Sequence, residues 1–234
     1  MDLKEYMSVR CACNVVRQET PAKERLTFDE FAILCHLYEA GEELRTSEIA
    51  DYQGVLRPTM THRTNHLARL GLITRHEGES DRRNVCCKIS EKGIEVKDQL
   101  CAEVCNNIQN GAPLHRSSPE RICKFVDAMG TMFCMSGDLV LLALQLSGDD
   151  SMSVSQIVRT LGLLQPTVSM SVSSLVDRGL VSRNRATPDA TRTLQVGLTP
   201  EGKARALELT AEVNKIVVRR NRRGRNEEEE TASE

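Results

Sequence analysis

Apolar residues recur along this chain with two different periods, and each change of period marks a switch from helix to strand. Between residues 28 and 38 the spacing is three to four, which predicts a helix with one buried face. Thr27 and Glu30 form a capping-box pattern at its start. Two further helices are predicted over 46–52 and 58–71, the second opened by a proline and ended by a glycine.

A hairpin follows these three helices. Residues 72–75 and 85–89 have the alternation of strands, and the charged stretch EGESDRRN between them reads as a turn. On the third helix we expect a core face made of Met60, Thr64, Leu67 and Ala68. The opposite, outward face then carries Thr61, His62, Asn65 and Arg69.

The same pattern occurs a second time, shifted by 108 positions. Leu34 aligns with Leu142, and the ungapped match runs from there to Asp81 and Asp189. Such a repeat, which includes both apolar and turn residues, indicates two similar folding units. The second copy predicts helices and strands over residues 136–145, 153–161, 166–179, 180–183 and 194–198.

Amphipathic segments flank both copies, near residues 3–16, 94–108, 119–133 and 200–217. None has a partner inside its own three-helix unit, so we expect these helices to pack on each other and to join the copies. The predicted domains are residues 1–110, residues 111–218, and a charged disordered tail over residues 219–234, with the stretch NNIQNGAPLHRSS, residues 106–118, as the linker between the copies. The arginines of this tail either add phosphate affinity or form only a solvated end.

Charge is distributed unevenly between the copies. The 234-residue chain has a formal net charge of −2. Residues 57–93 nevertheless carry eight Arg or Lys against four Asp or Glu, whereas residues 165–202 carry four against three. A polyanion is therefore expected to bind the first copy more strongly. The chain shows no apolar run of about 20 residues and no secretion signal at its N-terminus, which predicts a cytoplasmic protein without a membrane partner.

The nine cysteines are expected to be free thiols in a reducing compartment. Cys101 and Cys105 lie four residues apart, with His115 and Cys123 further along the chain, and this set is one candidate for a zinc or redox site. Core packing is the favoured alternative, because the first two lie on an apolar face and the C-x₂-C pair of common zinc sites is missing. We predict no cofactor and no metal. The sequence also lacks a glycine-rich phosphate loop, G-x-S-x-G and H-E-x-x-H, so we expect no enzyme activity.

Three helices and a two-stranded ribbon define a winged helix-turn-helix, whose third helix can enter a DNA major groove. The predicted fold is mainly α with small β-wings, in two tandem winged helix-turn-helix domains that the flanking helices join as an intramolecular pseudo-dimer. Hydroxyl, amide and basic side chains suit contacts to phosphates and base edges, and wing arginines suit a narrow minor groove. The candidate DNA-binding residues of the first copy are Arg57, Thr59, Thr61, His62, Arg63, Asn65, His66, Arg75, Arg82 and Arg83. Those of the second copy are Gln165, Thr167, Ser169, Ser173, Arg183, Arg185 and Arg192.

The runs RPTMTHRTNHLARLGLITRHEGESDRRNVCCKISEKG and QPTVSMSVSSLVDRGLVSRNRATPDATRTLQVGLTPEG resemble the MarR family of bacterial transcriptional regulators. Asp81 and Arg83 match the wing pair D-x-R of that family. The two copies make the chain similar to the two-domain Sar regulators within the family. The second copy departs from the pattern, with one extra residue in its wing motif and Met170 in the place of His62.

The resemblance implies a regulator, more often a repressor, that binds a pseudo-palindromic operator in double-stranded DNA. It also implies a small aromatic or phenolic effector, bound between the flanking helices and the DNA-binding units. One molecule of a pseudo-dimer would suffice for such an operator, so a monomer is favoured over an obligate homodimer. The alternative is a protein-interaction scaffold that keeps the fold with little DNA reading, because fold alone does not fix function.

Overall fold

The computed structural model of the chain describes residues 1–77, 85–148, 151–185 and 194–219. The first repeat contains α2 (Phe28–Ala40), β1 (Leu44–Arg45), α3 (Thr46–Gln53), α4 (Arg57–Arg69), β2 (Ile73–Glu77) and β3 (Val85–Ile89). The second repeat contains α7 (Ser136–Ser147), β4 (Met152–Ser153), α8 (Val154–Leu161), α9 (Gln165–Asp177), β5 (Val181–Arg185) and β6 (Leu194–Leu198). The flanking helices are α1 (Leu3–Glu19), α5 (Glu91–Asn107), α6 (Pro119–Met129) and α10 (Pro200–Lys215).

Each repeat is a winged helix-turn-helix, as the sequence predicts. The antiparallel sheet has the order β1-β3-β2 in the first unit and β4-β6-β5 in the second. The third strand of each sheet, β1 or β4, is an addition to the prediction, since two residues are too few to show an alternating pattern. The predicted wing tips, 78–84 and 186–193, lie outside the described residues.

Local signals explain where the helices start. The Thr27 hydroxyl accepts from the Glu30 amide and the Glu30 carboxylate accepts from the Thr27 amide, which confirms the predicted capping box. After each wing the next helix passes so close to the residue before the first wing strand that only glycine fits. A Cβ on Gly93 or Gly202 would overlap the carbonyl oxygen of Leu72 or Leu180, respectively.

The apolar core forms two clusters, and the repeats contribute to them unequally. The smaller cluster lies inside the first winged unit and includes Ile33, Leu34, Ile49, Met60 and Leu67. The larger cluster joins the second winged unit to the flanking helices and to the opposite face of α2, which contributes Phe31, Ala32 and Cys35. Helix α2 is therefore shared, with one face in each core.

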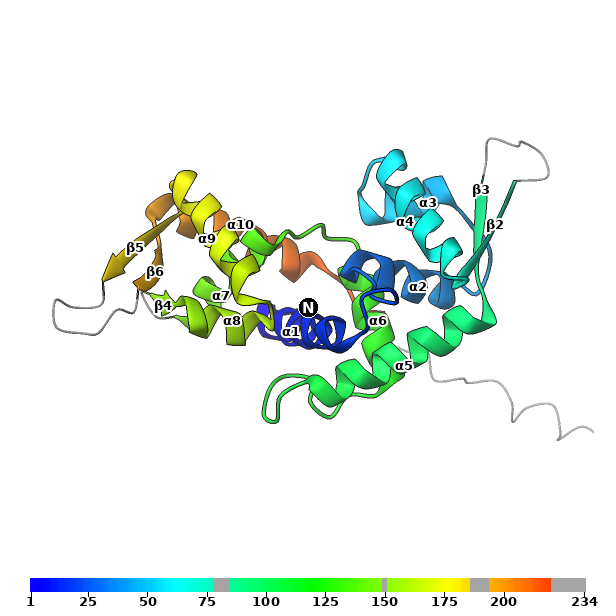
Figure 1. Cartoon of the computed structure of the whole chain (residues 1–234), viewed down its shortest axis with the longest axis horizontal. Helices are drawn as coiled ribbons and strands as arrows, with labels where there is room; N and C mark the ends of the chain where they lie inside the picture. Colours follow the sequence, from blue (N-terminus) through cyan, green and yellow to red (C-terminus); the bar gives the residue numbers. More distant parts are fainter. Residues whose placement is uncertain (78–84, 149–150, 186–193, 220–234) are drawn as a thin grey trace, which may run out of the picture.

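The flanking helices lie between the two winged units, which occupy opposite ends of the molecule (Figure 1). As predicted, they contact each other, through the pairs α1–α5, α5–α6 and α1–α10. Helix α1 also binds the second unit directly, because the buried amide of Asn14 donates to the carbonyl oxygen of Leu161 at 2.8 Å. The N-terminal amine of Met1 donates to the carbonyl of Ile216 at 2.8 Å. Within the described residues, every helix is too short or too polar to cross a bilayer.

Candidate DNA-binding surface

Helix α4 presents the outward face that its sequence predicts. Met60, Thr64 and Leu67 are fully buried, which fixes the rotation of the helix on α2 and α3. The opposite face is exposed and consists of Arg57, Thr59, Thr61, His62, Asn65 and Arg69. The helix contains three arginines and no carboxylate. It is therefore a cationic surface with hydroxyl and amide groups among the charges.

Two predicted DNA-binding side chains of this helix turn inward instead. The guanidinium of Arg63 donates to the Asp29 carboxylate at 2.5 Å and to the Gln53 side-chain oxygen at 3.0 Å. The ring of His66 lies 2.6 Å from Glu30 Oε1, while the other oxygen of that carboxylate caps α2. Both side chains hold α4 against its neighbours and so position the exposed face, and their direct contact with DNA stays a prediction.

The remaining candidates of the first copy belong to the wing. Arg75 is half-buried and pairs across the ladder with Cys87. Arg82 and Arg83 lie outside the described residues.

Helix α9 occupies the equivalent place in the second unit but has a different surface. It contains neither arginine nor lysine, and its last residue, Asp177, is an exposed acid. Gln165, Ser173 and Met170 are exposed, while Thr167 and Ser169 are half-buried. The exposed Arg183 of β5 donates to the Ser173 hydroxyl at 2.8 Å. Only the backbone of Arg185 is described, in β5, and Arg192 lies outside the described residues.

Sequence reasoning missed one apolar residue at the start of each third helix. Leu56 and Leu164 cap α4 and α9 at equivalent positions, and they remain 76% and 54% exposed. Single exposed apolar side chains are normal on protein surfaces, so neither leucine marks an interface by itself. The available signal was that both leucines precede the proline that opens the helix, on the outward side of the turn.

A cavity of about 450 Å³ lies where the flanking helices meet the first winged unit. Its apolar wall includes Val16 of α1, Phe28 and Phe31 of α2, and Leu100 of α5. Leu70 and Leu72, which directly follow α4, complete that wall, and Arg17, Lys92 and Glu103 are among its charged lining residues. This volume is in the range that holds small organic ligands.

The first winged unit is attached to α6 by a polar contact. The Asp127 carboxylate accepts from the Tyr52 hydroxyl at 2.9 Å and lies 3.0 Å from His36 Nδ1. The rings of His36 and Tyr52 stack with centroids 3.7 Å apart. These groups tie α2 and α3 to the central helices.

A cluster of cysteines also lies at this junction, but its members differ from the set that the sequence spacing suggests. Cys105 and His115 bond separately to the backbone oxygens of Ser117 and Ala112, whereas Cys101 and Cys123 meet Cys35 of α2. Hydrogen bonds from Cys101 and Cys35, and the charge of Lys97, hold the pKa of the Cys123 thiol below its usual value despite burial. Burial raises the pKa of the Cys13 thiol to about 12, so Cys13 lacks the thiolate character that an oxidation-sensing cysteine needs.

Taken together, two winged units in one chain, the first with an exposed basic third helix, define a tandem winged helix-turn-helix protein. Two family descriptions match the sequence, both of the MarR family, over residues 26–85 and 139–192. The chain therefore belongs to the MarR family of transcriptional regulators and carries two MarR-type domains in tandem.

Among solved structures, the chain is similar to YusO from Bacillus subtilis, with 24% identity and a TM-score of 0.35 over 39% of this chain. The chain spans 62% of the length of that YusO chain. BpsR from Bordetella bronchiseptica, whose DNA binding is regulated by 6-hydroxynicotinic acid, matches at 25% identity and a TM-score of 0.32, over 44% of this chain and 76% of its own. CouR from Rhodococcus jostii RHA1, solved with p-coumaroyl-CoA, matches at 19% identity and a TM-score of 0.35, over 55% of this chain and 87% of its own. A search of the curated proteins gave no match.

Proposed function

We propose that this chain is a regulator that binds double-stranded DNA sequence-specifically, with α4 as its main reading element, and that it acts as a repressor. The observation that carries the proposal is the outward face of α4. It exposes two arginines, two threonines, a histidine and an asparagine on a helix whose core side is fixed by burial. Arginines bind phosphates or guanine, and asparagine recognises adenine edges, so this set suits the major groove.

The proposal predicts that the two winged units contribute unequally to DNA affinity. Helix α4 exposes two arginines and contains no acid, while α9 has no cation and one exposed acid. Because phosphate contacts supply most of the nonspecific affinity, the first unit should contribute more of it. The absence of a cation from α9, together with its exposed Met170, favours the second candidate function, a protein-interaction role for the second unit.

A salt titration tests DNA binding. The full chain is used to select duplexes from a random pool, and affinity for the selected duplex is measured against salt concentration. We expect a steep negative slope that Arg57→Ala and Arg69→Ala each reduce by about 1, while Arg159→Ala, an exposed arginine on α8, serves as the control. A slope near zero for the native chain would remove the proposal.

A small aromatic or phenolic effector is the proposed regulator, and the cavity beside α1, α2 and α5 is its proposed site. Phe28, Phe31 and Leu100 supply an apolar wall, and Arg17 or Lys92 supplies a cation for a phenolate or carboxylate. Salicylate is the probe. It should raise the melting temperature and weaken DNA binding, and Leu100→Trp, which fills the cavity, should abolish both effects. A salicylate response that persists in Leu100→Trp would place the site elsewhere.

The proposal is for regulation and not for catalysis, because both repeats match a regulator family and the sequence carries none of the catalytic motifs considered above. Placing the selected duplex upstream of a reporter gene tests the sign of regulation. Repression predicts less reporter product when the chain is present.

A further inference from the structure

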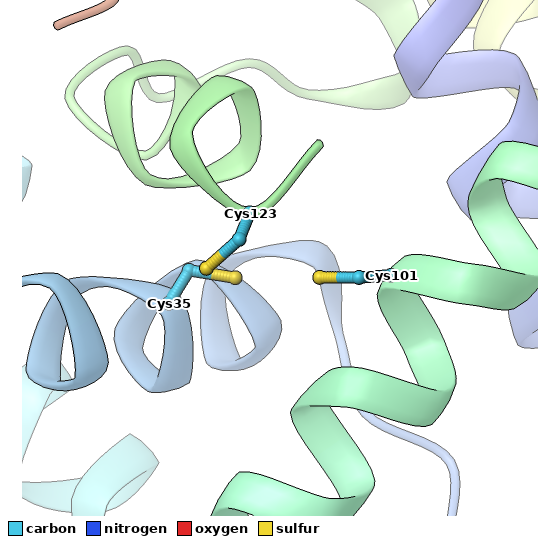
Figure 2. A group of neighbouring side chains, drawn as sticks. All are labelled: Cys35, Cys101 and Cys123. Atoms are coloured by element: carbon cyan, nitrogen blue, oxygen red, sulfur yellow. The ribbon is translucent and has the colours of Figure 1, made fainter. Parts of the chain in front are cut away.

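Three buried cysteines from three different helices converge on one point. Cys35 of α2, Cys101 of α5 and Cys123 of α6 have sulfur atoms that all lie within 4.8 Å of one another. Their exposed fractions are 0%, 1% and 1%. Figure 2 shows the three side chains pointing toward a shared space between the helices. The residues are 66 and 22 positions apart in sequence, so only the fold brings them together.

This spacing matches what one bound ion requires. With an ion–sulfur distance of about 2.3 Å, three sulfurs around one ion are roughly 3.4 to 4.0 Å apart, from a pyramidal to a planar arrangement. The 4.8 Å limit on the observed separations leaves only small side-chain movements for closure onto an ion.

The number and kind of ligands select the ion. Thiolate sulfur favours soft ions, and within the described part of the chain no histidine or carboxylate belongs to this group. Structural zinc prefers four ligands, whereas a trivalent arsenic-type ion forms three bonds to sulfur and keeps a lone pair. Charge points the same way, since three thiolates neutralise a trivalent ion, but a monovalent ion would leave two negative charges in an apolar core.

We propose that Cys35, Cys101 and Cys123 form a three-thiolate site for a soft trivalent metalloid ion of the arsenite type. Binding is an exchange without electron transfer. Arsenous acid, As(OH)₃, loses its three hydroxyl groups, three As–S bonds replace the As–O bonds, and the thiol protons leave with the hydroxyls as three water molecules. The product is neutral.

The position of the site gives binding a structural consequence. Cys35 precedes His36, which together with Tyr52 attaches the first winged unit to Asp127 of α6. An ion held by α2, α5 and α6 would therefore fasten the first winged unit to the central helices at a second point. This inference does not depend on DNA binding, and the tests below use none.

Native mass spectrometry of the reduced full chain with arsenite is the primary test. We expect one arsenic per chain with loss of three protons, together with a higher melting temperature. Cys35→Ala, Cys101→Ala and Cys123→Ala should each remove this three-bond adduct. Cys105→Ala is the matched control, because Cys105 lies one turn further along the same helix as Cys101 and binds a backbone oxygen. Lack of the adduct in the native chain, or its survival in all three variants, would overturn the proposal.

Two further measurements keep the test independent of variant folding. X-ray absorption at the arsenic edge of the native complex should show three sulfur neighbours, and oxygen neighbours would contradict the site. Zinc is the competing probe. A second, more exposed group with mixed donors, Glu43, His76 and Cys86, offers zinc a different place to bind. We expect zinc to leave the arsenic adduct in place. Displacement of arsenic by equimolar zinc would refute the preference for a trivalent ion.

Discussion

Arg63 and Arg57 lie on the same helix, and the structure predicts opposite consequences for their loss. Replacing Arg63 by alanine removes its two hydrogen bonds, one to Asp29 of α2 and one to Gln53 of α3. Gln53, which is 2% exposed, would lose the partner of its side-chain oxygen, at a cost of about 1–3 kcal/mol. The Asp29 carboxylate is 24% exposed and regains water, so losing this ion pair adds only about 1 kcal/mol. We therefore expect Arg63→Ala to lower the free energy of unfolding by about 2–4 kcal/mol.

Urea denaturation combined with salt-titrated DNA binding separates the two arginines. Arg63→Ala should destabilise the chain and leave the salt slope of the folded protein unchanged, because the native guanidinium is bound by Asp29 and Gln53. Arg57→Ala should do the reverse, with stability changed by less than about 0.5 kcal/mol and the slope reduced by about 1. If Arg63→Ala were as stable as the native chain and lost as much slope as Arg57→Ala, the inward placement of Arg63 would be refuted.

Three other predictions concern the wing, the glycines and the assembly. Arg83→Ala should weaken DNA binding and its salt dependence more than Arg192→Ala, because the first unit is more basic; equal losses in binding assays would make the second unit a full reader. Gly93→Ala and Gly202→Ala should each lower the free energy of unfolding by roughly 1–3 kcal/mol through overpacking, as measured by urea denaturation, and native-like stability would show that the wings shift easily. Light scattering should find one chain on a pseudo-palindromic duplex whose half-sites lie about 34 Å apart, whereas two chains per duplex would contradict the pseudo-dimer.

The sequence predicted the elements better than the contacts between them. Helices and wing strands repeat over many residues, so their periods and caps are visible in the chain itself, as Thr27 and Glu30 show. The partners of Arg63 were not visible, because Asp29 is 34 positions away and the helical period places residue 63 at the border of the exposed face. Cys35 lies within the apolar period of residues 28–38, yet its meeting with Cys101 and Cys123 depends on how three helices cross.

Glu30 links the wall of the cavity to helix α4 in the first winged unit. One carboxylate oxygen caps α2 and the other holds His66 of α4, while Phe28 and Phe31, in the same turn of α2, form part of the cavity wall. A ligand that shifts this turn would act on the position of α4 through the Glu30 and Asp29 side chains, without contacting DNA. Thermodynamic linkage makes the effect reciprocal, so whatever factor the ligand imposes on DNA affinity, DNA must impose on ligand affinity.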